Sequence, residues 1–501
     1  MTPFSLIQHN IKSIRGIIPY LGVFIILFTG TYSKNLNEST LVFYLIKYTI
    51  PALLIGLGIL FYLKKDYKNF LKLSIFIAFT INYQLHVVFI FLTLFLFNKK
   101  LLVPFNSPLK PIYLLFGMGL ISYIINQFIQ LNILSFPVFI FTFFLPFIFW
   151  GLFYNYGYGY KDELIEFFFN IVLIMSGIII LQFLLHPDLH PDYWNGGTPN
   201  AHIAAAYISI AFFLSIAKVL ELKHVSFIKH FREIIIIFSS LPLLFLTDAK
   251  YFLLLILFIL IVYFIVSPFI QRKIKALAVG TLAFLSIVFF STPDKPIPIS
   301  ILTIHSQSYN FNTVNTDFFN SPKYQLLQTT LRLPFYEPLT FLIGSGPGTF
   351  LSRAAFIQNT MSKNDTQTSY NFGREKSIPL SKIALKDTWI RDKYAKFSFK
   401  KEFDQGSLFN RRSGLISIYF ELGVIGLILF ILFHVGIIKI GLQGNGIQKK
   451  KHDMALIVLP ILFFAINYFS YWCEYQNYSI LQYGILGILL AQTSEKTEDR
   501  R

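Results

Sequence analysis

Long apolar stretches recur along the chain, separated by short polar segments. A stretch of about 20 apolar residues is the length an α-helix needs to cross the hydrocarbon core of a bilayer. The clearest such stretches cover residues 41–63, 111–133, 136–156, 163–185, 201–220, 274–290 and 414–440. The pattern therefore predicts an all-α fold, a polytopic bundle of transmembrane helices.

Three further apolar stretches, 70–97, 234–266 and 455–491, do not fit a single crossing. Asp248 and Lys250 interrupt the second like the tip of a helical hairpin, and the third divides around Glu474. If each stretch is a hairpin, the short loops rich in Lys and Arg all fall on one side, which the positive-inside rule assigns to the cytoplasm. That arrangement has about 14 crossings with both termini inside. If the first stretch is a single tilted or re-entrant helix, the number falls toward about 12.

Composition agrees with a membrane protein. Apolar residues make up 54% of the 501 residues, charged residues only 14%, and the mean hydropathy is +0.59, values that argue against a soluble protein. The first apolar segment, 17–32, lacks the features of a removable signal peptide, so we expect it to remain as a membrane anchor. The single cysteine, Cys473, excludes an intrachain disulfide framework and a Cys-based metal site.

One long polar insert, residues 293–412, interrupts the apolar series. We expect it to form a large, partly helical loop outside the membrane, between N-terminal transmembrane helices in 1–292 and C-terminal ones in 413–501 that end in a short cytoplasmic tail. The insert holds 16 Lys or Arg against 9 Asp or Glu, which favours an anionic partner. Within it, aromatic and basic residues alternate at helical spacing over 382–401, a pattern typical of a helix lying on the membrane surface.

A glycine-rich run from Gly344 to Arg353, Gly-Ser-Gly-Pro-Gly-Thr-Phe-Leu-Ser-Arg, lies in this insert. Gly344, Gly346 and Gly348 permit close backbone approach, and the Arg353 guanidinium suits phosphate. The run predicts a loop that approaches phosphate, although it lacks the Lys-Ser/Thr ending of a nucleotide P-loop. The alternative is a turn whose glycines serve only its shape.

A second polar segment, residues 186–202, contains two Asp residues besides His186 and His190. Its prolines forbid a regular helix presenting both His side chains, so a plain exterior loop is favoured over a metal site, and no metal site is expected. Asn200 precedes the helix predicted from residue 201. It either helps to present free amides to an anion or caps that helix.

Charged residues at membrane depth are costly unless they are paired or hydrated, so they often mark functional sites. Lys250, Asp248, Glu421 and Glu474 fall in or beside apolar stretches. The plain alternative places Lys250 and Asp248 at an exposed hairpin tip and Glu421 where a helix begins at the interface.

Four segments resemble the O-antigen ligase and polymerase superfamily of bacterial envelope polysaccharide proteins. Thr198-Pro-Asn-Ala-His-Ile-Ala-Ala-Ala-Tyr207 is similar to the family's Pro-Asn-x-x-Ala helix start, and Leu342-Ile-Gly-Ser-Gly-Pro-Gly-Thr-Phe350 to its exterior glycine motif. The segment Ser413 to Gly426, which contains Phe420-Glu-Leu-Gly-Val-Ile-Gly426, resembles its Glu-x-Gly-x-x-Gly helix opening, and Leu246-Thr-Asp-Ala-Lys250 resembles its hairpin tip, with Lys in place of Arg. Order and spacing agree over roughly residues 160–440.

The resemblance implies glycosyl transfer without a metal or other cofactor, at the outer face of the bacterial inner membrane. Its partners would be a polyprenyl-pyrophosphate-linked glycan, a sugar or lipid acceptor and membrane lipids, and no nucleic acid. Cations would hold the departing pyrophosphate where no metal does. The candidates are Arg332, Arg353, Lys250, Arg411 and Arg412, with Asn200 and the glycines at 344, 346 and 348 completing the substrate site.

The chain departs from the family in one respect. Ligases of the family typically carry a Ser-His-Asn type motif about nine residues before the Glu matched by Glu421, and here Arg412 occupies that register. This favours a polymerase of O-antigen, capsule or exopolysaccharide repeats, with Glu421 or His305 as the proton acceptor. A ligase is the first alternative. A glycan flippase, which would more naturally show related halves or broken helices, neither of which the sequence indicates, and an inactive scaffold are the others.

Overall fold

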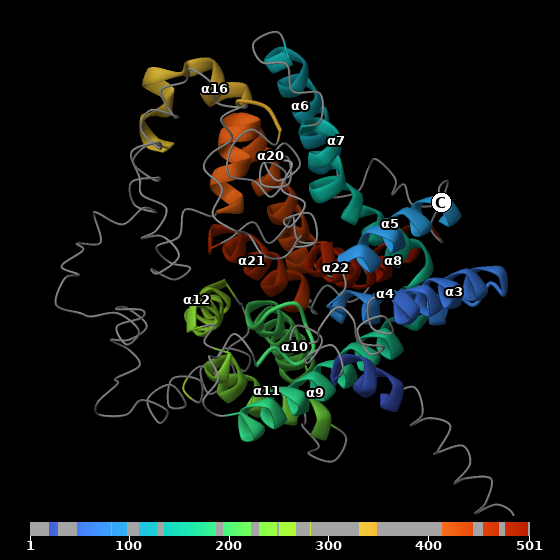
Figure 1. Cartoon of the computed structure of the whole chain (residues 1–501). Helices are drawn as coiled ribbons and strands as arrows, with labels where there is room; N and C mark the ends of the chain where they lie inside the picture. The colour runs from blue at the N-terminus through green and yellow to red at the C-terminus, as the bar shows by residue number, and fades with distance from the viewer. Residues whose placement is uncertain are drawn as a thin grey trace, which may run out of the picture.

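The computed structural model describes an all-helical chain without a strand in the part that it covers (Figure 1). The described residues are 20–28, 48–81, 83–97, 110–127, 135–186, 194–221, 230–247, 250–266, 281, 330–347, 413–443, 454–469 and 476–498. The principal helices are α3 (Ile50–Leu63), α4 (Tyr67–Phe79), α5 (Tyr83–Phe97), α6 (Lys110–Gln127), α7 (Ser135–Phe139), α8 (Ile148–Tyr156), α9 (Lys161–Leu185), α10 (Ala201–Glu221), α11 (Phe231–Leu246), α12 (Lys250–Val266), α16 (Pro338–Ile343), α20 (Gly414–Gln443), α21 (Met454–Phe469) and α22 (Gln476–Glu498).

Three of the described helices are long and apolar enough to cross a membrane: Lys161–Leu185, Ala201–Val219 and Gly414–Leu442. They coincide with three crossings predicted from the sequence. Other described helices are apolar but shorter, among them α3 and α21. The predicted crossing at 274–290 lies, apart from residue 281, outside the described residues.

The three ambiguous apolar stretches each contain two helices, as the hairpin interpretation predicted. The first divides into α4 and α5, the second into α11 and α12, and the third into α21 and α22. In the first hairpin, Asp66 caps α4 by accepting a hydrogen bond from the Asn69 amide at 3.2 Å. Across the turn, His86 Nε2 lies 2.9 Å from the Ile77 carbonyl oxygen, to which Thr80 Oγ1 also donates, so that this carbonyl has partners inside the protein.

The centre of the bundle is formed by α22, whose residues 477–491 are all buried. Two glycines explain how α8 packs so closely against it. A Cβ at Gly487 would lie 2.7 Å from the Trp150 carbonyl oxygen, and one at Gly484 would lie 3.0 Å from the Phe153 ring. Small residues at helix contacts allow backbones to approach closely, which is how helices gain packing energy in an apolar environment.

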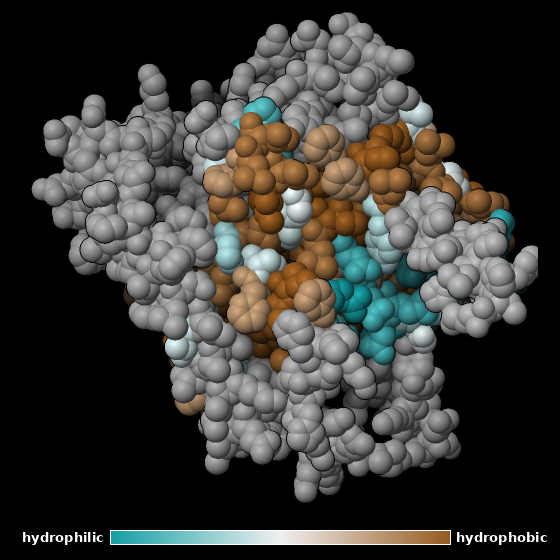
Figure 2. All heavy atoms as spheres, turned by 90° about the horizontal axis from the view of Figure 1, so that it is seen from below, coloured by the Kyte–Doolittle hydropathy of each residue, from teal (hydrophilic) through white to brown (hydrophobic). Residues whose placement is uncertain are grey.

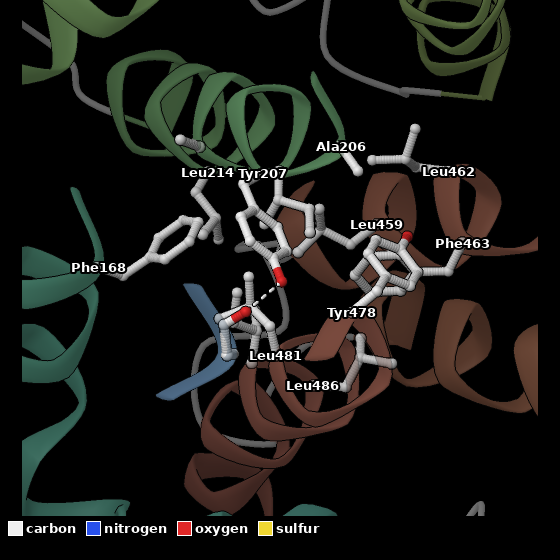
Figure 3. Close-up of a cluster of buried hydrophobic side chains, with 14 of the residues drawn as sticks. Phe168, Ala206, Tyr207, Leu214, Leu459, Leu462, Phe463, Tyr478, Leu481 and Leu486 are labelled. Carbon is white, nitrogen blue, oxygen red and sulfur yellow. Dashed lines mark hydrogen bonds between the residues drawn. The ribbon is translucent and has the colours of Figure 1, made fainter. Parts of the chain in front are cut away.

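A second buried contact joins α10 to the end of α4. The Tyr207 hydroxyl donates to the Ala78 carbonyl oxygen at 2.7 Å (Figure 3). The centroid of the Tyr207 ring lies 4.4 Å from that of the Phe79 ring. Leu459, Leu481 and their neighbours from α21 and α22 surround this tyrosine in the same view. The hydrogen bond satisfies a carbonyl near the end of α4.

Ion pairs connect the ends of α4, α9, α10 and α11. Lys68 and Lys72 of α4 both approach the Glu163 carboxylate. Lys218 Nζ lies 2.7 Å from Glu233 Oε1, and Arg232 contacts both Glu233 and a carboxylate of α9. The Glu233 side chain is 2% exposed, and its charge is offset by these two cations. The basic residues of α4 and α11 therefore lie beside the acidic start of α9, and Lys218 of α10 lies beside Glu233.

The outer surface carries many large apolar side chains, the most exposed on α5, α3 and α12 being Phe95, Leu63 and Ile265. Seen from below, the described surface is mostly hydrophobic, with a compact hydrophilic area (Figure 2). Soluble monomers rarely expose contiguous apolar areas of this kind, whereas lipid contact requires them.

Replacing Tyr207 with Phe will test the buried contact between α10 and α4. The change keeps the ring but removes the hydroxyl that donates to the Ala78 carbonyl oxygen. Because that buried carbonyl then loses this hydrogen bond, the free energy of unfolding should fall by about 1–3 kcal/mol. Chemical denaturation of the purified protein in detergent micelles measures this. The control is Tyr160→Phe, at a 37% exposed residue, which should change stability little. Equal effects in the two variants would contradict the assigned role of the hydrogen bond.

Candidate functional site

Helix α20 is broken at Gly423, where the backbone has φ 70° and ψ −178°. This conformation is available to glycine and strained for other residues. Gly423 is the tenth residue of the helix, so a short first half precedes a longer second half. At the break the carbonyl groups of Phe420 and Glu421 accept hydrogen bonds from outside the helix.

The donors come mainly from the glycine-rich loop that follows α16. The Ser345 amide donates to the Phe420 carbonyl oxygen at 2.8 Å, and the Gly346 amide donates to that of Glu421 at 3.1 Å. Ser345 Oγ adds a second bond to Phe420 at 3.0 Å. Ser345 and Phe420 are 75 residues apart in sequence, so two separate sequence motifs form one unit.

Glycines on both sides make this contact possible. A Cβ at Gly344 would lie 2.2 Å from the Glu421 carbonyl oxygen, and one at Gly423 would lie 2.2 Å from the Leu342 carbonyl oxygen. Gly344 also has a positive φ of 83°. Gly344 is therefore needed for the shape of the turn, as the alternative interpretation of the loop held. The Ser345 and Gly346 amides donate to carbonyl oxygens of α20.

Helix α6 completes the arrangement (Figure 1). Ser122 Oγ donates to the Glu421 carbonyl oxygen at 3.2 Å, across 299 residues of sequence. A Cβ at Gly119 would lie 3.7 Å from Leu422 and 3.8 Å from Pro347, so α6 packs against both the broken helix and the loop. We call this unit of α6, the 344–347 loop and the break in α20 the glycine junction.

Glu421 is buried at the glycine junction, with 1% of its surface exposed. Ser417, on the first half of α20, and Ser413, the residue just before that helix, precede it at four-residue spacing, which places all three on one side. Ser413 Oγ donates to the Asn467 carbonyl oxygen of α21 at 3.4 Å. Ser417 Oγ is buried and has no hydrogen-bond partner in the described structure. A polar stripe therefore runs along a buried part of α20 and ends at the candidate proton acceptor.

Arg332 lies on the helical segment 330–336, close to α16 in sequence, and its side chain is exposed. The Tyr419 hydroxyl donates to the Thr330 carbonyl oxygen at 3.1 Å and so ties this segment to the first half of α20. The structure thereby places an exposed guanidinium on an element attached to the glycine junction.

Asn200 belongs to a different local structure. Its Oδ1 accepts from the Ile203 amide at 2.8 Å, which makes it the cap of α10. Thr198 Oγ donates to the carbonyl oxygen of Asn200 at 2.8 Å, and the Gly196 amide donates to Gln182 Oε1 at 2.9 Å. The capping interpretation of Asn200 is confirmed, and the loop before α10 is fastened to α9.

The remaining candidates cannot be placed at the junction. Lys250 is the first residue of α12, and its side chain is not described. His305, Gly348, Arg353, Arg411 and Arg412 lie outside the described residues, as do Asp248, Glu474, His190 and the segment 382–401. Among the residues that the structure covers, no group of three His, Cys, Asp or Glu side chains is placed to hold a metal ion.

The break in α20 and the contribution of Ser122 were not predicted from the sequence. The resemblance places a helix opening within Ser413–Gly426, and α20 does begin there, at Gly414, but the resemblance gives no expectation of the break at Gly423. A glycine inside an apolar helical pattern often has a packing or functional reason, but α20 contains five glycines and the pattern does not single out Gly423. Ser122 carried no comparable signal.

Comparisons with known proteins add no relative, because the chain matches no protein-family model, no curated protein and no solved structure. Fold and site define the class: an all-helical protein with helices suited to a membrane, containing a broken helix closed by a glycine-rich loop.

Alanine at Gly344 or Gly423 should separate the loop from α20, because each new Cβ would overlap a backbone carbonyl. We expect a large fall in monodisperse protein after solubilisation and, in any folded fraction, a lower melting temperature. Gly117→Ala in α6 is the matched control, since its Cβ would meet nothing within 4 Å. Size-exclusion chromatography and thermal denaturation in detergent give both readouts. Wild-type behaviour of both junction variants would rule out the close approach.

Proposed function

We propose that this protein is an envelope polysaccharide polymerase of the bacterial inner membrane. In this proposal a polytopic bundle of about 12–14 crossings holds the insert 293–412 on the outer face, with both termini in the cytoplasm. The enzyme transfers a growing glycan from a polyprenyl-pyrophosphate carrier to a sugar hydroxyl of the next repeat unit, and no metal or cofactor takes part.

The observation that carries the proposal is the glycine junction. Two of the segments that resemble the O-antigen ligase and polymerase superfamily, the glycine motif and the Glu-x-Gly-x-x-Gly motif, are joined by backbone hydrogen bonds from Ser345 and Gly346. If these short motifs matched the superfamily only by chance, there would be no reason for them to lie in contact in the structure. Their contact supports a shared function, and the position of Glu421 at the contact supports a catalytic one.

The chemistry assigned to the site is a displacement at the anomeric carbon. The acceptor hydroxyl oxygen forms the new glycosidic bond while the bond from that carbon to the pyrophosphate oxygen breaks. The hydroxyl proton passes to the Glu421 carboxylate, with His305 as the alternative acceptor. The pyrophosphate leaves with its added negative charge held by cations, for which Arg332 is the candidate on a described element.

A glycan transporter is the second candidate, and the break in α20 favours it. Transporters bind substrates at helices interrupted near the middle of the membrane, where unpaired backbone groups face the substrate. In α20 the break lies about a third of the way along, and protein donors occupy the two freed carbonyls. That occupancy supports an enzyme or a structural junction over a transport site.

The test is envelope glycan profiling in a deletion strain that carries the wild type or a variant at matched expression. Glu421→Gln and Arg332→Ala should abolish or strongly reduce long chains, because each removes a group needed at the reacting centre. The controls are Glu166→Gln, whose side chain is 48% exposed, and Lys439→Ala, near the far end of α20. Arg353→Ala extends the test to the loop beyond Pro347. Gel electrophoresis of the glycans and extraction of lipid-linked intermediates give the result.

The intermediates distinguish the candidates. Single lipid-linked repeat units that accumulate without long chains establish a polymerase. Long lipid-linked chains that never reach their acceptor identify a ligase instead. An unchanged glycan profile in the deletion strain excludes both enzymes and leaves transport or a scaffold role.

A further inference from the structure

The arm before the glycine loop, residues 330–343, turns a row of large apolar side chains outward. Leu331, Phe335, Leu339 and Leu342 recur at intervals of four, four and three residues, the spacing of one helical face. Their exposed fractions are 66%, 84%, 55% and 46%, and the neighbouring Tyr336 is 58% exposed. The row continues across the irregular residue at 337 that separates the two helical pieces.

The arm is attached to the rest of the protein on the side opposite to this apolar row. Leu333 is completely buried, and the Phe341 ring meets the Tyr419 ring at 6.1 Å. The Glu337 and Phe341 amides donate within the arm at 2.9 Å each, which keeps its two helical pieces in register. With the Thr330 bond to α20 and the glycine junction at its other end, the arm is fixed with its apolar row outward.

The arm packs against α20, which is long and apolar enough to cross a membrane, and against the shorter apolar helix α6, and both helices carry outward apolar side chains. On α20, Ile425, Ile428 and Leu432 are exposed, and α6 exposes Leu120 and Ile121. In Figure 1 α16 lies beside the end of α20 where the helix begins, with α6 on the other side of α20. An apolar surface that continues from the side of a membrane-suited helix onto an element at its end fits the boundary between acyl chains and headgroups.

We propose that residues 330–343 lie in the lipid boundary of one leaflet. The apolar row enters the acyl region, Tyr336 lies at the level where interfacial aromatic rings are enriched, and the exposed Arg332 guanidinium faces lipid phosphate. In water, five large apolar side chains would remain exposed at a cost in free energy. At a lipid surface the acyl chains cover these side chains and the phosphates pair with the guanidinium. The proposal requires only that the chain is embedded in a membrane and is independent of the glycan chemistry.

The arm would also set the depth of the candidate site. The glycine junction follows the arm directly, so an arm at headgroup level holds Glu421 close to the plane where lipid phosphates lie. If the proposed function is correct, a lipid-linked pyrophosphate enters at the same depth. This consequence rests on the proposed function, although the position of the arm does not.

Depth-dependent fluorescence quenching tests the position of the arm. Cys473 is the only cysteine, so Cys473→Ser gives a background in which one introduced cysteine carries an environment-sensitive fluorophore. Phe335→Cys and Leu339→Cys report the arm in vesicles of phosphatidylcholine and phosphatidylglycerol. The quenchers are lipids spin-labelled near the headgroup, lipids spin-labelled near the chain end, and aqueous iodide. Size-exclusion chromatography confirms folding of each labelled variant.

Two matched sites calibrate the readout. Leu432→Cys, 48% exposed on α20, should be quenched most by the deep label, and Lys64→Cys, exposed after α3, by iodide. We expect both arm sites to lose more fluorescence to the shallow label than to the deep label or iodide. Quenching by iodide as strong as at residue 64 would place the arm in water. Deep quenching like that at residue 432, or protection from all three quenchers by a second copy or other protein, would equally overturn the proposal.

Discussion

The arrangement of the candidate site depends on the need to satisfy two helix carbonyls. A buried backbone carbonyl without a donor is costly, and in an apolar environment every such group must find a partner within the protein. The turn at Gly423 displaces the carbonyls of Phe420 and Glu421 from the regular helix, and the donors come from Ser345, Gly346 and Ser122. Helix, loop and α6 are therefore held together by one local irregularity.

This constraint links features that would otherwise be unrelated. The loop can reach the break only because glycines at positions 344 and 423 leave room for the opposing backbone. Its docking orients the arm that precedes it, so that apolar side chains such as Phe335 face outward while Leu333 is buried. It also leaves Glu421 enclosed at the junction, next to a stripe of serines. A polar site and an apolar surface thus share one anchoring point.

Ion pairs, rather than backbone hydrogen bonds, hold the ends of α4, α9, α10 and α11 together. There Glu233 is enclosed with Lys218 and Arg232, so a buried charge is tolerated because it is paired. Their contact depends on charge, whereas the sequence predicted only that the loops rich in Lys and Arg lie on one side of the membrane. The glycine junction follows from backbone hydrogen bonding, for which composition carries little signal. The role of Asn200 could be predicted in part, because capping is a local interaction and was one of the two interpretations that the sequence allowed.

The sequence by itself determined the helical class, the position of most helices and the division of the three long apolar stretches into pairs. These properties depend on apolar length and local periodicity, which neighbouring residues specify. Only the tertiary structure decided which segments meet: Ser122 with Glu421, the loop with α20, and Tyr207 with the end of α4. Such contacts join groups far apart in the chain, and the donor of a given carbonyl is chosen by packing geometry that no local pattern encodes.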